Sequence, residues 1–452
     1  MKRTLALLAL WLTTAAQPIG ATSTGPDVQR LTMKEALNTA LGQNHLIKAA
    51  GFSATAASQG VGIATSAYYP AVFFEESFGV SNGPPQTFMM KLDQGRFTTG
   101  DFAIDKLNHP SAHHNFKSAL TLQQPIYNPS IAPMREMAVK DAEKGTLGLE
   151  GAKQGIAFQV FQAYLEAQKS AAHRSAAEQA VAQAREHLRL ANVRSEAGVG
   201  LKSDELRART YLAAMESQAI NANNNLVLAE MRLAMVVGLA TGSRIEPAES
   251  FAGFTGTFQA EELIASALEN RSDLLQARAE LEKTDAAVKL SRSAYLPSVG
   301  GFASYQMNAE HAPFGNDNDA WGAGISLNWQ IFDGFRRYRE HGRATAGRSA
   351  AAEALEQARR EASYQVRESI LRREEAEKRR EVARNALLDA EETVRLLSKR
   401  FENSLGTMTE LLDAQSALDQ ARANLVESEA NHTLSGGQIY YSSGQFLKEM
   451  NK

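Results

Sequence analysis

Two carboxylates, Glu410 and Asp413, are the side chains with the clearest chemical potential, and they stand three residues apart. On a helix this spacing places both on one face, where together they could attract a cation. A solvated helix face is the simpler interpretation, and the residues alone leave both open. Three histidines, His109, His113 and His114, offer metal-ligand chemistry, but wet surface loops often collect histidines, so we expect no metal site.

No pattern for catalysis or for cofactor binding accompanies these residues. The chain has no cysteine, which excludes disulfides, thiolate catalysis and cysteine-ligated zinc. We recognise no Ser-His-Asp set and no glycine-rich phosphate loop, so we expect neither an enzyme nor a cofactor. The net charge of -3 on 452 residues gives no indication of a nucleic-acid partner.

The N-terminus has the layout of a cleavable signal peptide. Lys2 and Arg3 precede a short apolar run, and small residues follow it. The run is too short to span a bilayer, which needs about 20 apolar residues. We therefore expect residues 1–21 to be a signal peptide, with a buried N-terminal helix as the alternative.

The positions of proline and glycine show which parts of the chain can form long helices, and Glu410 and Asp413 lie in one of them. No proline occurs in residues 134–246 or 314–452, and an interior proline costs a helix about 3 kcal/mol. Short breaks that contain Gly200 and Gly406 divide each stretch in two, and the second stretch has the 3-4-3-4 apolar spacing of a coiled coil. The expected helices are about 133–197, 202–237, 334–403 and 408–435.

Four segments between the helices are apolar at every second position. The clearest is residues 321–331, where large apolar residues alternate with small or polar ones. Each segment has about 10 residues, the length of a tilted transmembrane strand with one face toward lipid and one toward a wet lumen. A half-buried sheet of a soluble protein is the alternative. The expected strands are about 71–80, 116–126, 298–308 and 321–332.

The chain contains an internal duplication. The motif Ser-Ala-Tyr-x-Pro occurs at residues 66–70 and again at 293–297, and the break at Gly200 recurs at Gly406. The first strand hairpin carries an insert within residues 81–115 that the second lacks. The expected units are a first repeat (27–240), a linker (241–258), a second repeat (259–435) and a C-terminal tail (436–452).

Four strands cannot close a membrane barrel, because known membrane barrels have at least about eight. An open sheet edge in lipid would also leave backbone groups unpaired. Several chains must therefore share one barrel. A trimer provides twelve strands, and its long helices can pack edge to edge as a tube of coiled-coil pairs. The predicted fold class is an α+β membrane protein with an α-barrel and a 12-stranded trimeric β-barrel.

With these features the sequence resembles the TolC family of outer-membrane efflux proteins along nearly all of its mature length. The resemblance rests on the paired Ser-Ala-Tyr-x-Pro motifs, on residues 123–128 with their counterpart 328–334, and on residues 410–415 after the second break. It implies a homotrimer in the outer membrane with a helical tunnel in the periplasm. The implied function is the exit duct of a tripartite efflux or type I secretion system. The implied partners are a periplasmic adaptor, an inner-membrane pump of the ABC, RND or a similar class, and outer-membrane lipid.

The resemblance also implies roles for individual residues. Glu410 and Asp413 take the place of an acidic pair that forms a cation-attracting constriction at the periplasmic entrance. The helix-turn residues implied to contact the adaptor are Val199, Gly200, Leu201, Leu405, Gly406 and Thr407. The residues implied to lead into the barrel are Tyr68, Pro70, Tyr295 and Pro297. Ser404 departs from the family pattern, which commonly has glycine there.

A periplasmic adaptor subunit of the same kind of machine is the rival interpretation. Such a protein also has a signal peptide and a coiled-coil hairpin. It would, however, show a single helical hairpin between two halves of a small β-domain. The duplication of both strands and helices favours the channel.

Overall fold

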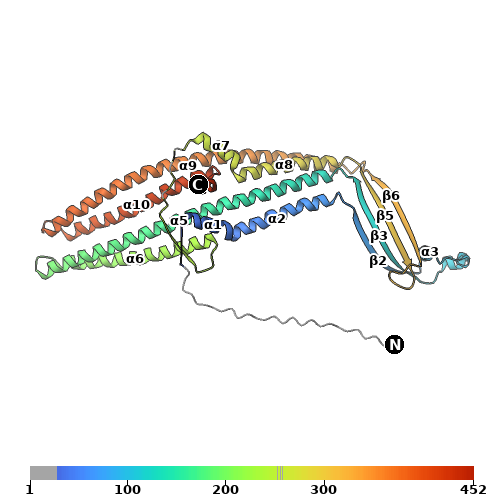
Figure 1. Cartoon of the computed structure of the whole chain (residues 1–452), viewed down its shortest axis with the longest axis horizontal. Coiled ribbons are helices and arrows are strands. Elements are labelled where there is room, and N and C mark those ends of the chain that lie inside the picture. Colours follow the sequence, from blue (N-terminus) through green and yellow to red (C-terminus); the bar gives the residue numbers. More distant parts are fainter. Residues whose placement is uncertain (1–27, 252, 255, 257, 452) are drawn as a thin grey trace, which may run out of the picture.

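The computed structural model describes residues 28–251, 253–254, 256 and 258–451. The molecule is elongated, with long helices that lead into a sheet at one end (Figure 1). The predicted signal peptide, residues 1–21, lies outside the described residues. Within the described part of the chain, no helix combines the length and the apolar character needed to cross a bilayer.

Two long helical hairpins make up most of the molecule, as the spacing of proline and glycine predicts. They are formed by α5 (Ile131–Glu196) with α6 (Lys202–Val237) and by α9 (Arg336–Glu402) with α10 (Met408–Ser442). Two shorter helices, α2 (His45–Ser66) and α8 (Ser272–Ser293), pack beside the halves of α5 and α9 nearer the sheet (Figure 1).

The sheet contains the four expected strands, in the order β2-β3-β5-β6 and antiparallel throughout. They are β2 (Ala71–Ser81), β3 (His113–Tyr127), β5 (Ser298–Ala309) and β6 (Asn318–Asn328). The predicted end of the last strand at residue 332 is wrong. After Asn328 the chain leaves the ladder, because the Trp329 indole donates to the Tyr295 carbonyl at 3.1 Å and Arg337 binds the Ile331 carbonyl at 2.9 Å.

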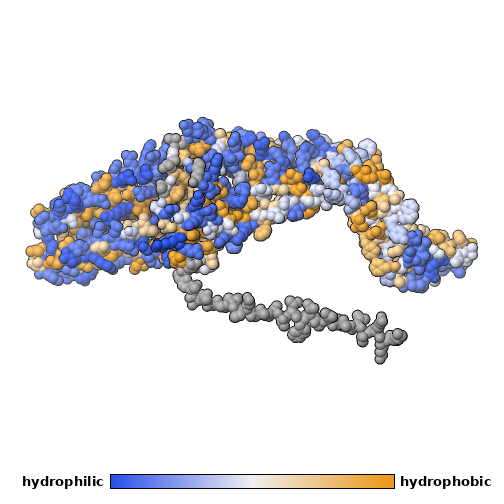
Figure 2. Space-filling model, viewed as in Figure 1, coloured by the Kyte–Doolittle hydropathy of each residue, from blue (hydrophilic) through white to orange (hydrophobic). Residues whose placement is uncertain are grey.

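The register of the strands gives the sheet two chemically different faces. We call the apolar face the one that carries Val72, Phe74, Phe78, Leu120, Leu122, Tyr305, Trp321, Ile325 and Leu327. The polar face carries mainly Glu75, Ser77, Lys117, Thr121, Gln123, Ser304, Gln306, Asn308 and Ser326. The exceptions are Glu76 and Asp319 on the apolar face and Phe73 and Phe302 on the polar face. Glu76 accepts a hydrogen bond from Ser118. Figure 2 shows hydrophobic residues gathered over the sheet, whereas the helices have a mixed, largely hydrophilic surface.

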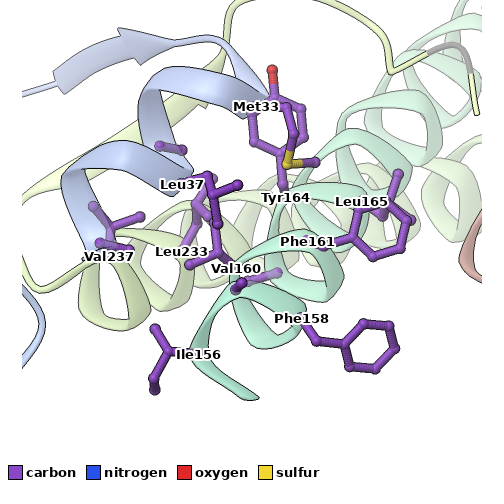
Figure 3. Packing of buried hydrophobic residues seen from close by; sticks show 14 of the residues in the cluster. Met33, Leu37, Ile156, Phe158, Val160, Phe161, Tyr164, Leu165, Leu233 and Val237 are labelled. Carbon is purple, nitrogen blue, oxygen red and sulfur yellow. The ribbon is translucent and has the colours of Figure 1, made fainter. Parts of the chain in front are cut away.

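A compact aromatic core joins the two halves near the middle of the helices. Phe161 and Tyr164 of α5 are fully buried there, together with Leu37 of α1 (Met33–Gln43) and Leu233 of α6 (Figure 3). Phe446 of α11 (Phe446–Met450) closes the same core. Full burial of such side chains contributes about 1.5–3 kcal/mol each. The remaining elements of this region are α7 (Ala260–Asn270), β1 (Val28–Leu31) and β4 (Arg244–Pro247). Strand β4 lies in the predicted linker and pairs with β1 in parallel.

Helix α10 continues through Gly436 and Gly437, so its predicted end at residue 435 is wrong. The Phe161 ring lies where a Cβ of Gly437 would have to be, and the Phe254 side chain packs less closely on Gly436, where a Cβ would lie 3.1 Å from it. These glycines therefore allow aromatic rings to approach the helix backbone. The actual end of the helix is followed by Gly444 with φ +73°.

The insert in the first strand hairpin is folded. It contains α3 (Pro84–Asp93), the short 3-10 helix η1 (Thr99–Phe102) and α4 (Ile104–Asn108). The corresponding connection in the second half, between β5 and β6, has neither helix nor strand.

Candidate functional site

The first hairpin tip, between α5 and α6, is a glycine-capped helix end. Gly198 has φ +71°, and the Val199 and Gly200 amides both donate to the Arg194 carbonyl, at 3.1 and 2.9 Å. Gly200 packs so closely on this turn that a Cβ would lie about 3.0 Å from Arg194 and Ser195 atoms. Val199 and Leu201 are 68% and 66% exposed. The break thus presents two apolar side chains to solvent on a constrained turn.

The second hairpin tip, between α9 and α10, repeats this geometry without the first glycine. Ser404 has φ +61°, and the Leu405 amide donates to the Arg400 carbonyl at 2.8 Å, as Val199 does to Arg194. Leu405 is 71% exposed. The left-handed conformation costs a residue with a Cβ about 1–2 kcal/mol. Ser404 therefore replaces the glycine of the first tip, and the turn keeps the same backbone conformation and hydrogen bond.

An interaction that sequence reasoning missed offsets this cost and joins the two tips. Arg194 of the first hairpin donates to the Phe401 carbonyl at 2.6 Å and to the Ser404 hydroxyl at 3.0 Å. Its guanidinium carbon also lies 4.7 Å from the centre of the Phe401 ring. Arg400, its counterpart in the second repeat, instead donates to Leu405 of its own turn. Of these two equivalent arginines, only Arg194 therefore bonds across to the other hairpin, from the first tip to the second. We call this interaction the tie between the tips.

Glu410 and Asp413 lie in the first turns of α10, both exposed, whereas Leu411 and Leu412 between them are buried. Glu410 also closes a capping box: its carboxylate accepts from the Thr407 amide at 3.0 Å, and the Thr407 hydroxyl accepts from the Glu410 amide at 3.3 Å. This backbone hydrogen bond, with a smaller contribution from the charge of Arg400, holds the pKa of Glu410 below its usual range. Within one chain Glu410 is therefore a structural cap as well as an exposed anion.

A polar network connects the two hairpins farther from the tips. Tyr211 of α6 donates to Asp419 of α10 at 2.8 Å, and Gln415 donates to Gln183 of α5 at 2.7 Å and to Asp419 at 3.1 Å. Burial, followed by the Asp419 carboxylate, raises the pKa of Tyr211. His187 of α5 is buried beside this network, and its burial lowers its pKa. No sequence pattern pointed to this network, because its members become neighbours only when the hairpins pack.

The paired motifs that begin at Ser66 and Ser293 form equivalent turns from helix into sheet. The Tyr68 amide donates to Thr65 at 3.0 Å and the Tyr295 amide donates to Arg292 at 3.1 Å, and Pro70 and Pro297 come directly before β2 and β5. Each tyrosine carbonyl accepts a hydrogen bond from a side chain at the helix-proximal end of a neighbouring strand: Gln124, within β3, donates to Tyr68 at 3.0 Å, and Trp329, directly after β6, donates to Tyr295 at 3.1 Å. The sequence repeat is thus a structural repeat at these positions.

The second junction has an additional buried ion pair. Arg337 donates to Asp333 at 2.8 Å, and both side chains are less than a tenth exposed. The same guanidinium donates to the Ala294 and Ile331 carbonyls, and it lies 5.1 Å from the centre of the Tyr295 ring. The position of Asp333 in the first repeat is occupied by Asn128, which caps the next turn by accepting from Ser130. This ion pair fixes the start of α9 against the sheet.

Comparisons with known proteins agree with this architecture. The model of the family "Outer membrane efflux protein" matches residues 36–239 and 263–445, two segments that fit the predicted duplication. No curated protein sequence matches the chain.

Several solved structures share the fold at low sequence identity. The CmeC outer membrane channel of Campylobacter jejuni is 16% identical with a TM-score of 0.77, over 93% of this chain and 89% of that one. The outer membrane protein VceC of Vibrio cholerae is 17% identical with a TM-score of 0.75, over 91% and 96%. The open MtrE channel of Neisseria gonorrhoeae is 15% identical with a TM-score of 0.75, over 92% and 89%.

Proposed function

The chain belongs to the outer membrane efflux protein family, and we propose that three copies of it form the outer-membrane exit duct of an efflux machine. The family match along both halves of the chain carries this proposal. Substrates would pass from an inner-membrane pump and a periplasmic adaptor through the helical tunnel and then through the barrel to the cell exterior. Such a duct has no reaction to catalyse, in agreement with the lack of a catalytic pattern in the sequence.

The chemistry of the sheet supports a shared barrel. Its apolar face suits lipid and its polar face suits a wet lumen. Within the described residues, β2 and β6 each pair with a neighbour on one side only. Backbone groups left unpaired in lipid cost several kcal/mol each, so the edge of β2 should pair with the edge of β6 from the next copy.

The experiment that tests the duct is purification from the outer-membrane fraction, followed by mass measurement in mild detergent and recordings in planar bilayers. We expect a stable trimer with channel activity. A stable monomer in mild detergent would contradict the shared barrel.

We propose that the two tips dock the adaptor through Val199, Gly200 and Leu201, and in part through Leu405, Gly406 and Thr407. The support is the exposure of three apolar side chains on turns held by backbone hydrogen bonds. A Val199→Ser/Leu201→Ser variant should lose export but still assemble as a trimer, because the tip is remote from the sheet. Unchanged export at normal protein levels would remove the docking role.

We also propose that Glu410 and Asp413 form a cation-attracting constriction at the periplasmic entrance. Both carboxylates are exposed one turn apart on α10, and a threefold axis would repeat them to a ring of up to six. Because the cap lowers the pKa of Glu410, this residue should remain charged through the neutral range.

A further inference from the structure

The insert between β2 and β3 is packed on the sheet through a chain of buried amide side chains. Gln94, directly after α3, is 1% exposed and donates to the His114 carbonyl at 2.7 Å and to the Asn115 side chain at 3.0 Å. Asn115 of β3 in turn donates to Asn308 of β5 at 2.9 Å, and Asn308 is also 1% exposed. Buried amides that bond one another in this way fix the position of the segment that carries them.

These contacts place the insert on the polar face. Asn115 pairs with Gly79 and Asn308 pairs with Lys117 in the strand register, and all four belong to the polar set of positions. The Met90 side chain of α3 approaches Gly79 on this same face. At the far edge of the sheet, the Asn318 side chain donates to the Asp93 carbonyl at 3.1 Å. The insert therefore crosses the sheet from β2 to β6 on its polar side.

The insert is a folded body rather than a loose loop. Its rings pack edge to face, Phe88 with Phe97 at 4.6 Å and Phe97 with Phe102 at 5.1 Å between centroids. A Lys91–Asp101 ion pair at 2.8 Å joins α3 to η1. A second ion pair, between Arg96 and Glu310, joins the insert to the β5–β6 connection.

We propose that this insert is a size-selective constriction inside the outer mouth of the barrel. The proposal rests on the proposed function, because it takes the polar face of the sheet as the lumen. A helix with its side chains is about 10–12 Å across. An eight-stranded barrel is just filled by its own side chains, and barrels of 16–18 strands leave an aqueous channel. Three such inserts in a 12-stranded barrel therefore occupy much of its cross-section and set an upper limit on the size of a passing molecule.

The sequence itself supplies a clean deletion. Ser81 pairs with His113 at the end of the β2–β3 ladder, and Asn82-Gly83 follows Ser81. Removal of residues 84–112 leaves Asn-Gly as a two-residue loop between these paired positions, which is the favoured sequence for such a hairpin. Asn308→Ala provides a second variant, which removes one anchor of the insert and leaves both strand lengths unchanged. Each variant is first checked for trimer formation in detergent.

The assay uses the natural absence of cysteine. Thr121→Cys places a single thiol on the polar face below the insert, and labelling from outside intact cells is followed with a small charged maleimide and with one attached to a polyethylene glycol chain. Leu120→Cys, the adjacent position on the apolar face, is the matched control that lipid should protect from both reagents. Lys106→Cys, exposed on α4, should react with both.

With the insert present, we expect the small reagent to label Thr121→Cys and the polymer reagent to fail. Deletion of 84–112 should restore labelling by the polymer, and Asn308→Ala should accelerate it. Polymer labelling of Thr121→Cys at the same rate with and without the insert would overturn the constriction while leaving the duct intact. Labelling of Leu120→Cys in place of Thr121→Cys by the small reagent would instead show that the polar face does not line a lumen, and would overturn the proposed function with it.

Discussion

The one-directional tie between the tips predicts a measurable difference between two arginines at equivalent positions. Replacing Arg194 with alanine removes a hydrogen bond to the Phe401 carbonyl, one to the Ser404 hydroxyl and the contact with the Phe401 ring. Hydrogen bonds from a charged donor contribute about 1.5–3 kcal/mol each when buried, and an exposed cation–π contact about 0.5–1 kcal/mol. Arg194 is only partly buried and water replaces some of these interactions, so we expect a loss of about 2 kcal/mol.

Hydrogen exchange at the second tip measures this loss. The Leu405 amide is bonded within the turn that Arg194 supports, so its opening free energy should fall in Arg194→Ala. A loss of about 2 kcal/mol corresponds to exchange about 30-fold faster, since about 1.4 kcal/mol is tenfold. Amides in the middle of the sheet should exchange at unchanged rates and serve as the internal reference.

Arg400→Ala is the matched control. Its guanidinium has one hydrogen bond to Leu405, at 3.2 Å, within its own exposed turn. Such a bond contributes about 0.5–1 kcal/mol, so exchange should accelerate by no more than about fivefold. Equal acceleration in the two variants would refute the reasoning, because it would mean that the contacts of Arg194 across the hairpins add nothing to the stability of the turn.

Three further predictions concern the core, the hairpin contact and the entrance. Gly437→Ala should destabilise the protein by about 1–3 kcal/mol, seen as a lower denaturation midpoint, because its Cβ collides with a buried aromatic ring. The control is Gly347→Ala, where a Cβ has open space within α9, and it should stabilise the protein by up to about 1 kcal/mol. His187 has a lowered pKa in the folded state, so the unfolded state binds more protons as the pH drops below about 6.5. The free energy of unfolding should therefore fall with decreasing pH in that range. His187→Gln should reduce this pH dependence in denaturation curves. Glu410→Gln/Asp413→Asn should reduce cation preference and block by multivalent cations from the periplasmic side in single-channel recordings; wild-type selectivity and block in this variant would return the pair to a solvated helix face.

The long elements were predictable because single residues determine their ends. An interior proline is too costly in a helix, and a reversal between two helices needs a left-handed residue, so the absence of proline and the position of Gly200 located the first hairpin. The period of two in residues 321–331 located a strand because side chains alternate across a sheet. These signals are local, and one sequence is enough to read them.

The errors arose where distant parts of the chain decide the local structure. Gly436 and Gly437 suggested a helix end, but they lie within α10 because aromatic rings from α5 and the linker pack on them. The last strand ends early because the Trp329 indole binds a carbonyl of another segment. The tie from Arg194 and the folding of the insert have no periodic signal at all, since both depend on contacts between elements far apart in the sequence.

The two junctions between helix and sheet also bear on how the halves of this protein diverged. Gln124 and Trp329 occupy equivalent positions and share neither size nor polarity, yet each brings an N–H group to the carbonyl of the matching tyrosine. The turn therefore requires a donor at one point in space, and two unrelated side chains supply it. Trp329 meets that requirement while remaining 55% exposed, so an indole can hold the turn and still present an amphipathic ring to the surroundings of the sheet. Comparison of donor positions, rather than of residue identities, would then be the more sensitive way to recognise such ancient duplications.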